Sequence, residues 1–286
     1  MEINIVLFGI VLPVVLGAAC ITWWGSSTHA RGGDFIWGPA LSITVFVSAL
    51  SQDSLVNFTS QNKWLWFACS VLLCGLPVGA GIFLTRPTTT RSFVVCACAI
   101  LGALLLNIPG WHNIMERFLL AVALVPYVFL LLIALQKRGD FSTPMALSFA
   151  LIAPSVLAML SGFAKLSIPI GAASCLLGCA SLVQICFSSR TMIHARVGQS
   201  GAVVVASIAT LGAATGFGYD TNGVSTLSWL LAAIAPLGLW FGEVPLIRPR
   251  PTLAICLRIL GCVILAAASI VIALRDLYFL GVPIVE

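Results

Sequence analysis

The sequence predicts an all-α integral membrane protein of about ten transmembrane helices, arranged as two inverted five-helix repeats. The first observation is that apolar stretches of about twenty residues follow one another along nearly the whole chain. The second is the composition, with 60% hydrophobic and 8% charged residues and a mean hydropathy of +1.11. Such values lie far outside the range of a soluble domain of 286 residues. The third is a set of sequence landmarks that recur in the same order in both halves.

The apolar stretches have the length of membrane spans. A helix rises about 1.5 Å per residue and therefore needs roughly 20 apolar residues to cross a hydrocarbon core about 30 Å thick. The second, fourth and sixth stretches are short or interrupted by proline, which makes nine to ten spans the expected number. The spans are expected near residues 3–24, 34–50, 64–84, 92–109, 117–136, 144–163, 168–187, 200–219, 226–247 and 252–274.

The first span is expected to remain in the protein. A secretory signal begins with positive charge, whereas Glu2 is the only charged residue before His29. A β-barrel is not expected either, because barrel strands alternate apolar and polar residues and the run 118–135 does not.

The basic residues predict the orientation. Cytoplasmic loops are enriched in Lys and Arg. The loops after the odd-numbered spans carry Arg31, Arg86, Arg91, Lys137, Arg138, Arg190, Arg196, Arg248 and Arg250, and the other side carries Lys63, Arg117, Lys165 and Arg275. Both termini are therefore expected outside the cytoplasm, in a multi-pass protein of the cell membrane. Several tryptophans are expected to anchor spans in the interface, where tryptophan is common. They are Trp64, Trp66, Trp111 and Trp229 near predicted outer boundaries and Trp23 and Trp24 near an inner one.

Landmarks repeat between residues 1–138 and 139–286. Phe8-x4-Pro13 is echoed by Phe149-x4-Pro154, and Gly75-x3-Gly79-x-Gly81 by Gly212-x3-Gly216-x-Gly218. Leu101-Gly102-x6-Pro109 is echoed by Leu237-Gly238-x6-Pro245, and Ile133-Ala134-Leu135 by Ile272-Ala273-Leu274. These matches predict a duplication of five spans, although apolar sequences also match one another by chance.

A duplication of five spans has a mechanical consequence. Because five is odd, the second half enters the membrane in the opposite orientation, as in many secondary transporters that expose a midplane site to each side in turn. The alternative is a duplication that persists in a protein without transport activity. In size and five-plus-five plan the chain resembles the drug/metabolite transporter superfamily. The resemblance covers the general plan and no motif, and members of that superfamily usually place both ends in the cytoplasm.

Two charged residues within the spans are the first candidates for function. Charge inside a membrane is costly, so each should face protein, water or a partner. Glu243 lies about one turn before the inner end of the ninth span, and Arg258 about two turns into the tenth from the same side. The two are expected to pair across neighbouring helices. Either Glu243 is a proton or cation site modulated by Arg258, or the pair is structural.

Proline and asparagine add further candidates for a solute or ion pathway. Asn107 and Pro109 match Glu243 and Pro245 in the proposed duplication, and a proline within a helix frees a backbone carbonyl that could line a cavity. Ordinary interfacial helix ends would look the same. Asp220 lies on the outer side, where it is either at a cavity mouth or a solvated loop residue.

The remaining composition argues against several other classes. His29, His112 and His194 fall in loops, and the ten cysteines have no acidic or histidine neighbours, so no cofactor or metal is expected. No phosphate-binding loop, HExxH or GxSxG is present, so an enzyme is not expected. The basic residues are too scattered for nucleic-acid binding. The expected partners are membrane lipid and a small-molecule or ion substrate, with a second copy or another membrane subunit as a further class.

The predicted function is thus secondary transport of a small solute by alternating access, coupled to protons or cations. The first alternative is a non-catalytic anchor or scaffold subunit of a larger complex. The second is an intramembrane lipid-modifying enzyme.

Overall fold

The described part of the chain is built from helices joined by short turns. The computed structural model describes residues 6–27, 33–52, 64–80, 114–136, 141–187, 197–244, 247 and 250–279, and these residues contain no strand. Within these residues, five helical segments are long and apolar enough to cross a membrane: Ser142–Leu160, Ala164–Cys186, Ser200–Gly218, Thr226–Glu243 and Pro251–Phe279. Shorter apolar helices include Leu7–Ile21, Ile36–Gln52, Leu65–Leu76 and Pro126–Leu135.

The helices fall where hydropathy predicts spans. In the first half they are η1 (Leu7–Val11), α2 (Leu12–Ser27), α3 (Gly33–Gln52), α4 (Leu65–Ala80) and α6 (Ile114–Gln136). In the second half they are α7 (Ser142–Leu160), α8 (Ala164–Phe187), α9 (Gln199–Gly218), α10 (Thr226–Ile234), η4 (Ala235–Glu243) and α11 (Pro251–Phe279). Their bounds lie within about five residues of the predicted ranges at the ends that are described. The predicted fourth span, 92–109, lies outside the described residues.

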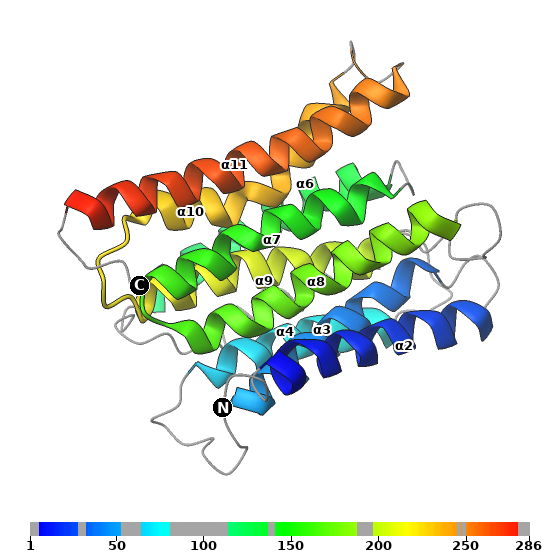
Figure 1. The fold of residues 1–286 in the computed structure, drawn as a ribbon, viewed down its shortest axis with the longest axis horizontal. Coiled ribbons are helices and arrows are strands. Elements are labelled where there is room, and N and C mark those ends of the chain that lie inside the picture. Colours follow the sequence, from blue (N-terminus) through cyan, green and yellow to red (C-terminus); the bar gives the residue numbers. More distant parts are fainter. Residues whose placement is uncertain are drawn as a thin grey trace.

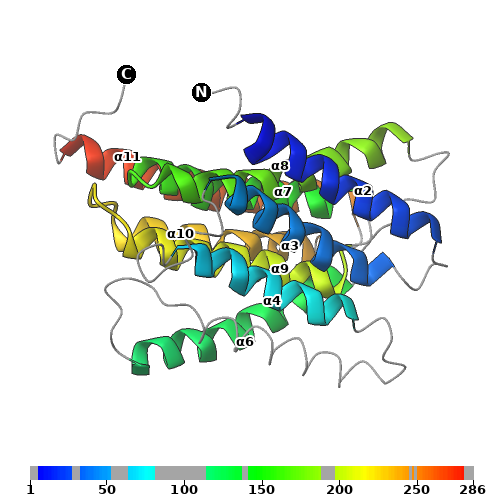
Figure 2. The same ribbon diagram turned by 90° about the horizontal axis from the view of Figure 1, so that it is seen from below.

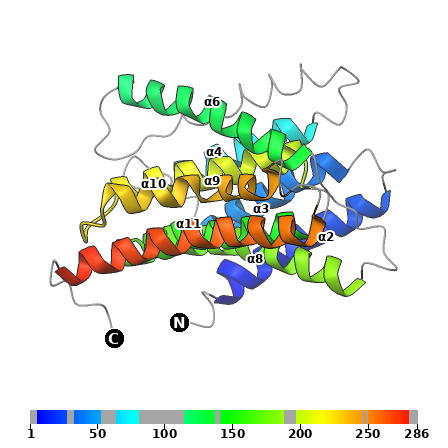
Figure 3. The same cartoon turned by 90° about the horizontal axis from the view of Figure 1, so that it is seen from above.

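The helices lie side by side in two layers (Figures 1, 2 and 3). One layer holds α2, α8, α7 and α11; the other holds α3, α4, α9 and α10 with η4, and α6 lies on its outer side. We call the end of the bundle at which α7 begins the Ser142 end, and the end at which it finishes the Phe163 end. The helices α2, α4, α8 and α10 run toward the Ser142 end, whereas α3, α7, α9 and α11 run toward the Phe163 end.

Helix α9 is the centre of the bundle. It packs against α3, α4, α6, α7 and α10. Of its most apolar stretch 78% is buried within the protein, compared with 28% of the corresponding stretch of α11. The sequence allows this position because α9 consists mainly of Gly, Ala, Ser, Thr and Val, whose small side chains permit close helix contact on several sides. Helix α11 instead exposes an apolar face of the kind that lipid covers.

Serines join α7 to α8 at intervals of seven residues. Ser148 and Ser174 each donate to the other's backbone carbonyl at 2.8 Å, and Ser155 donates to the carbonyl of Ser167 at 2.8 Å. Ser181 donates to the carbonyl of Phe141 at 2.8 Å. A repeat of seven keeps one face of each helix against the other along its whole length.

Small residues join α2 to α3 at intervals of four. Pro13 has no N–H to donate to the carbonyl of Gly9, and the hydroxyl of Ser48 in α3 donates to that carbonyl instead. Thr44 donates to the carbonyl of Pro13 at 3.2 Å. The helices approach closely at Gly17, where a Cβ would collide with the Thr44 hydroxyl. Two helix pairs with matching landmarks therefore use different contacts.

Two tryptophans predicted as interfacial anchors are buried instead. Trp64 and Trp229 are each 3% exposed. Trp229 lies against Gly216, where the missing side chain leaves room for the indole ring. Hydropathy places both residues near the ends of spans. It does not show whether a residue faces lipid or protein, and here both face protein.

Candidate functional site

The ninth predicted span is a broken helix. It is α-helical over Thr226–Ile234 and continues as a 3₁₀-helix over Ala235–Glu243. The change occurs at Pro236, in the first turn of η4. A 3₁₀-helix longer than about four residues is uncommon, and one that interrupts a longer helix often marks a hinge. At about 2.0 Å per residue, η4 also extends this short span to about 31 Å in total.

Tyr127 of α6 holds the broken helix at its midpoint. In the 3₁₀ pattern the carbonyl of Ala233 would accept from residue 236, which is a proline without an N–H. The Tyr127 hydroxyl donates to that carbonyl at 2.8 Å. This contact satisfies a backbone group that could not otherwise be buried among apolar helices. It also links the first half of the chain to the second.

Glycines bring η4 into backbone contact with α11. A Cβ at Gly238 would lie 2.5 Å from the backbone nitrogen of Cys262 and 2.5 Å from the carbonyl carbon of Gly261. A Cβ at Gly242 would collide with the Cγ of Arg258 and lie 2.6 Å from the carbonyl oxygen of Ala254. The absence of side chains at these positions lets the aliphatic part of Arg258 cross η4.

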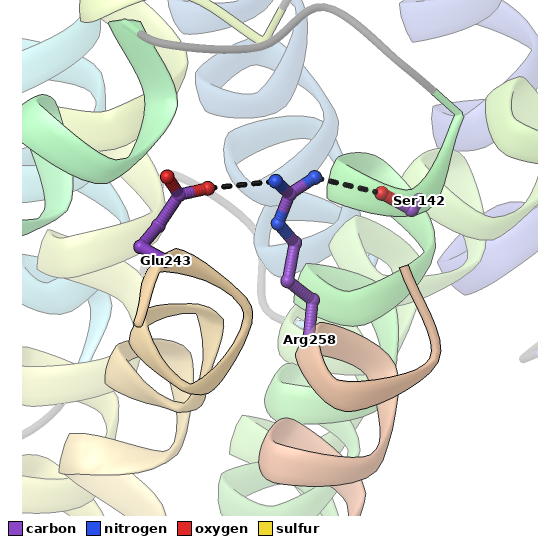
Figure 4. A network of polar contacts seen from close by, with 3 residues as sticks. All are labelled: Ser142, Glu243 and Arg258. Atoms are coloured by element: carbon purple, nitrogen blue, oxygen red, sulfur yellow. Dashed lines mark hydrogen bonds and ion pairs between the residues drawn. The ribbon is translucent and has the colours of Figure 1, made fainter. Parts of the chain in front are cut away.

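Arg258 of α11 contacts two other elements at the Ser142 end (Figure 4). Its Nη2 donates to Oε1 of Glu243 at 2.7 Å, and its Nη1 donates to the hydroxyl of Ser142 at 3.3 Å. The side chains of Arg258 and Glu243 are 2% and 3% exposed. The predicted pairing is therefore present, and it joins η4, α11 and the first residue of α7.

The charges in this cluster neutralise each other in a place shielded from water. A charge-assisted hydrogen bond at this distance is strong, and the planar guanidinium can serve two acceptors at once. The other buried polar residues that the structure describes are serines and threonines. Among the described residues, buried charge is therefore gathered at Glu243 and Arg258. Arg258 lies about two helical turns from the start of α11.

Asp220 has a structural contact of its own. Its Oδ1 accepts from the backbone N–H groups of Asn222 at 2.9 Å and Gly223 at 3.1 Å. This is the hydrogen bonding of a turn-forming aspartate. Asp220 lies in the turn after α9, where the N–H of Thr221 bonds to the carbonyl of Ser161 at the end of α7, whereas Arg258 connects Glu243 to Ser142 at the start of α7. Asn107, Pro109 and Pro245 lie outside the described residues.

Sequence reasoning missed Tyr127, Pro236 and Ser142. A signal existed for Pro236, since it lies in the middle of an apolar span rather than near its end. Tyr127 follows Pro126 in the middle of another span, where a buried hydroxyl needs a partner. Ser142 gave no signal, because many serines precede predicted spans.

Comparisons with known proteins found no relative of this chain. No protein-family model matches the sequence, and neither a curated protein nor a solved structure matches it.

Proposed function

We propose that this chain is a secondary transporter of a small solute, with ten spans in two inverted halves that expose a central path to each side in turn. The observation that carries the proposal is the broken helix of α10 and η4, held at its break by Tyr127. Discontinuous spans are typical of solute and ion sites in such carriers, because the break provides both a hinge and backbone groups for binding.

The arrangement of the halves supports an inverted repeat. Helices offset by five predicted spans run in opposite directions: α2 against α7, α3 against α8, and α4 against α9 (Figure 1). Two of these pairs, α3 with α8 and α4 with α9, pack against each other, as expected for helices next to an axis that relates the halves. The matched glycines also agree, since Gly75 faces α3 and Gly212 faces α8.

Glu243 is the proposed coupling residue. It is the last residue of η4, so a movement of η4 at its break carries the carboxylate with it. Once separated from Arg258, the carboxylate would bind a proton or cation from water, and on return the guanidinium of Arg258 would replace that ion, which leaves to water. Arg258 therefore sets the affinity of Glu243 for its ion in this proposal.

The test is solute-driven flux in proteoliposomes that contain the purified chain and a trapped pH-sensitive dye. Cationic, anionic and neutral solutes are added outside, and movement of protons with the solute is followed. Glu243→Gln is expected to abolish coupled flux. Asp276→Asn is the matched control, because Asp276 lies near the opposite end of α11 and its loss should leave flux unchanged.

A second variant separates the broken helix from the ion pair. Tyr127→Phe removes the hydroxyl that satisfies Ala233 and keeps the ring, and it is expected to slow flux without abolishing coupling. Absence of flux with every class of solute, together with obligate co-purification of another membrane protein, would instead favour a subunit of a larger complex.

A further inference from the structure

Two serines inside the bundle are buried without a hydrogen-bond partner. Ser70 lies in α4 and Ser207 in α9, and both are fully buried. Neither hydroxyl has a hydrogen-bond partner among the described residues. Other buried serines do have one: Ser42 donates to the carbonyl of Val71 at 3.1 Å. Buried polar groups usually have partners, so two unsatisfied hydroxyls need an explanation.

Contacts between neighbouring helices place the two serines at nearly the same level of the bundle. Gly38 of α3 donates to the hydroxyl of Ser200 at 3.1 Å, and a Cβ at Gly75 would lie 2.9 Å from the carbonyl oxygen of Gly38. Gly38, Ser200 and Gly75 therefore share one level. From there Ser207 lies seven residues forward along α9, and Ser70 lies five residues back along α4, which runs the other way. At 1.5 Å per residue, both are about 8–10 Å from that level, toward the Phe163 end.

A second contact agrees with this alignment of the helices. A Cβ at Gly212 of α9 would lie 3.6 Å from Cε2 of Phe67 in α4. Phe67 precedes Ser70 by one turn and shares its face of α4, while Gly212 lies further along α9 than Ser207, so this contact is on the Phe163 side of both serines. Helices α4 and α9 pack against each other. The two serines thus lie at one level within the contact of α4 with α9.

The same two serines are equivalent positions in the proposed duplication. The glycine landmarks of α4 and α9 begin at Gly75 and Gly212, and Ser70 and Ser207 each lie five residues earlier. Residues related by a two-fold axis share a level only where the axis passes between their helices. In an inverted repeat the serines would therefore mark that axis, near the middle of α9. Solute sites of secondary transporters lie at this place, close to the membrane midplane.

The surroundings define the chemistry of a ligand. A serine hydroxyl has one donor and two acceptor positions, so two hydroxyls can hold one molecule that both donates and accepts. The neighbouring side chains Phe67, Val71 and Ile208 are apolar and fully buried. Among the described residues, buried charge is gathered in the Glu243–Arg258 pair, where it is already neutralised. An ion at the serines would lose its hydration without gaining a counter-charge, whereas an uncharged polar molecule would not.

We infer that Ser70 and Ser207, here called the serine pair, form a binding site for a small uncharged molecule that donates and accepts hydrogen bonds. The molecule is either water or a solute with a hydroxyl or carboxamide group, and each would satisfy both serines. The position of the serine pair on an axis rests on the proposed function. The inference deepens that function, because it makes the transported solute a neutral, polar one.

The first arm of the test removes the hydroxyls and needs no solute. Ser70→Ala, Ser207→Ala and the double variant are made in the full chain, and their thermal midpoints are measured in detergent. If water bridges the serine pair, each single variant should lower the midpoint by about 2–4 °C. The double variant should fall no further than the single ones, because the first substitution already releases the water.

Ser269→Ala is the matched control for the first arm. Its hydroxyl is equally buried in a helix but has its own acceptor, the carbonyl of Ser228 at 2.9 Å. The gain in helix propensity from alanine is therefore the same as at the serine pair. The loss in Ser269→Ala should add in full to that of Ser207→Ala, since the two residues share no partner.

The second arm adds solutes. Glycerol and acetamide are the neutral probes, and acetate and ethylammonium are their charged counterparts. Each solution is applied to the unaltered protein and to the double variant, so that general effects of the solute on stability cancel. If the serine pair binds a solute, a neutral probe should raise the midpoint of the unaltered protein by about 2 °C or more beyond the rise in the double variant. Ser269→Ala should keep this difference.

The outcomes separate water, solute and an unoccupied serine pair. A shared loss without a solute effect identifies water, and a difference confined to neutral probes identifies the solute. Without a solute effect, losses that are absent or that add in full would overturn the site, as would an equal difference with charged probes. Neither arm depends on transport. A supported site in a chain that moves no solute rejects the proposed function alone, whereas flux that is equal in the double variant, with both arms negative, rejects the site alone.

Discussion

Arg258 and Glu243 are buried charges, and each stabilises the protein only while the other is present. Removing an ion from water costs several kcal/mol, which the partner offsets only when the geometry is good. Here the distance is 2.7 Å and Ser142 occupies a second donor of the guanidinium. A structural pair and a coupling pair look alike at rest. They differ in what happens when one partner is lost.

The ion pair leads to a stability prediction. Arg258→Met should lower the free energy of unfolding by about 3–5 kcal/mol, because it leaves the carboxylate of Glu243 buried without its counter-charge. Glu243→Leu alone should cost a similar amount. The double variant should recover most of the loss, since apolar residues of similar volume replace both charges. Equilibrium unfolding in mixed detergent micelles measures all three.

Arg275→Met is the control for this cycle. Arg275 is exposed near the end of α11, over the ring of Phe279 at 5.7 Å, and its replacement should change stability by no more than about 0.5 kcal/mol. Single variants at 243 and 258 that change stability no more than Arg275→Met would mean that water reaches the pair in the folded protein.

At the scale of elements, the surroundings of a proline decide whether the helix that contains it stays regular. Pro39, Pro126, Pro154 and Pro169 all lie inside regular α-helices. Pro236 instead lies in the first turn of a nine-residue 3₁₀-helix. Two neighbours account for the difference, since Tyr127 satisfies the freed carbonyl and α11 approaches through glycine. A tighter helix is narrower, and this allows the backbone contact at Gly238.

That contact leads to the second prediction. Gly238→Ala places a Cβ 2.5 Å from backbone atoms of α11, which cannot rotate away, and should lower the free energy of unfolding by about 1–3 kcal/mol through overpacking. Gly171→Ala is the matched substitution in α8, where the nearest atom is the Ser155 hydroxyl at 3.3 Å. It should be neutral or stabilising by up to about 1 kcal/mol, because alanine favours the helix. Thermal unfolding in detergent compares the two, and equal losses would contradict the contact.

These elements also separate what the sequence could predict from what it could not. Spans follow from apolar length, and the pairing of Glu243 with Arg258 follows from the cost of charge at similar depth in neighbouring spans. The break at Pro236 could not be predicted, because proline is tolerated wherever another helix satisfies the freed carbonyl, and that helix is distant in sequence. Likewise, the sequence predicts Trp64 and Trp229 at the lipid interface, because the helices that bury them are distant in sequence.

At the scale of the whole molecule, the corresponding helix pairs of residues 1–138 and 139–286 differ in the side chains that join them. The α2–α3 pair uses glycine and proline at intervals of four, and the α7–α8 pair uses serine at intervals of seven. Intervals of four favour steep right-handed crossings and intervals of seven shallow left-handed ones. If the halves come from one duplication, we expect them to differ in rigidity. The α7–α8 pair, which serine hydrogen bonds join along its length, should be the more rigid of the two pairs.

The two-half arrangement makes a topology prediction. If each half crosses the membrane five times, a reporter inserted in the loop 137–140 and one fused after residue 286 must lie on opposite sides. The basic loops predict that the first lies in the cytoplasm and the second outside, because Lys and Arg are retained on the cytoplasmic side. A reporter that is active only in the cytoplasm should therefore work at 137–140 and fail at 286. The measurement does not depend on transport. Activity at both positions would require an even number of crossings in the second half, and the halves could not then be inverted copies of one another.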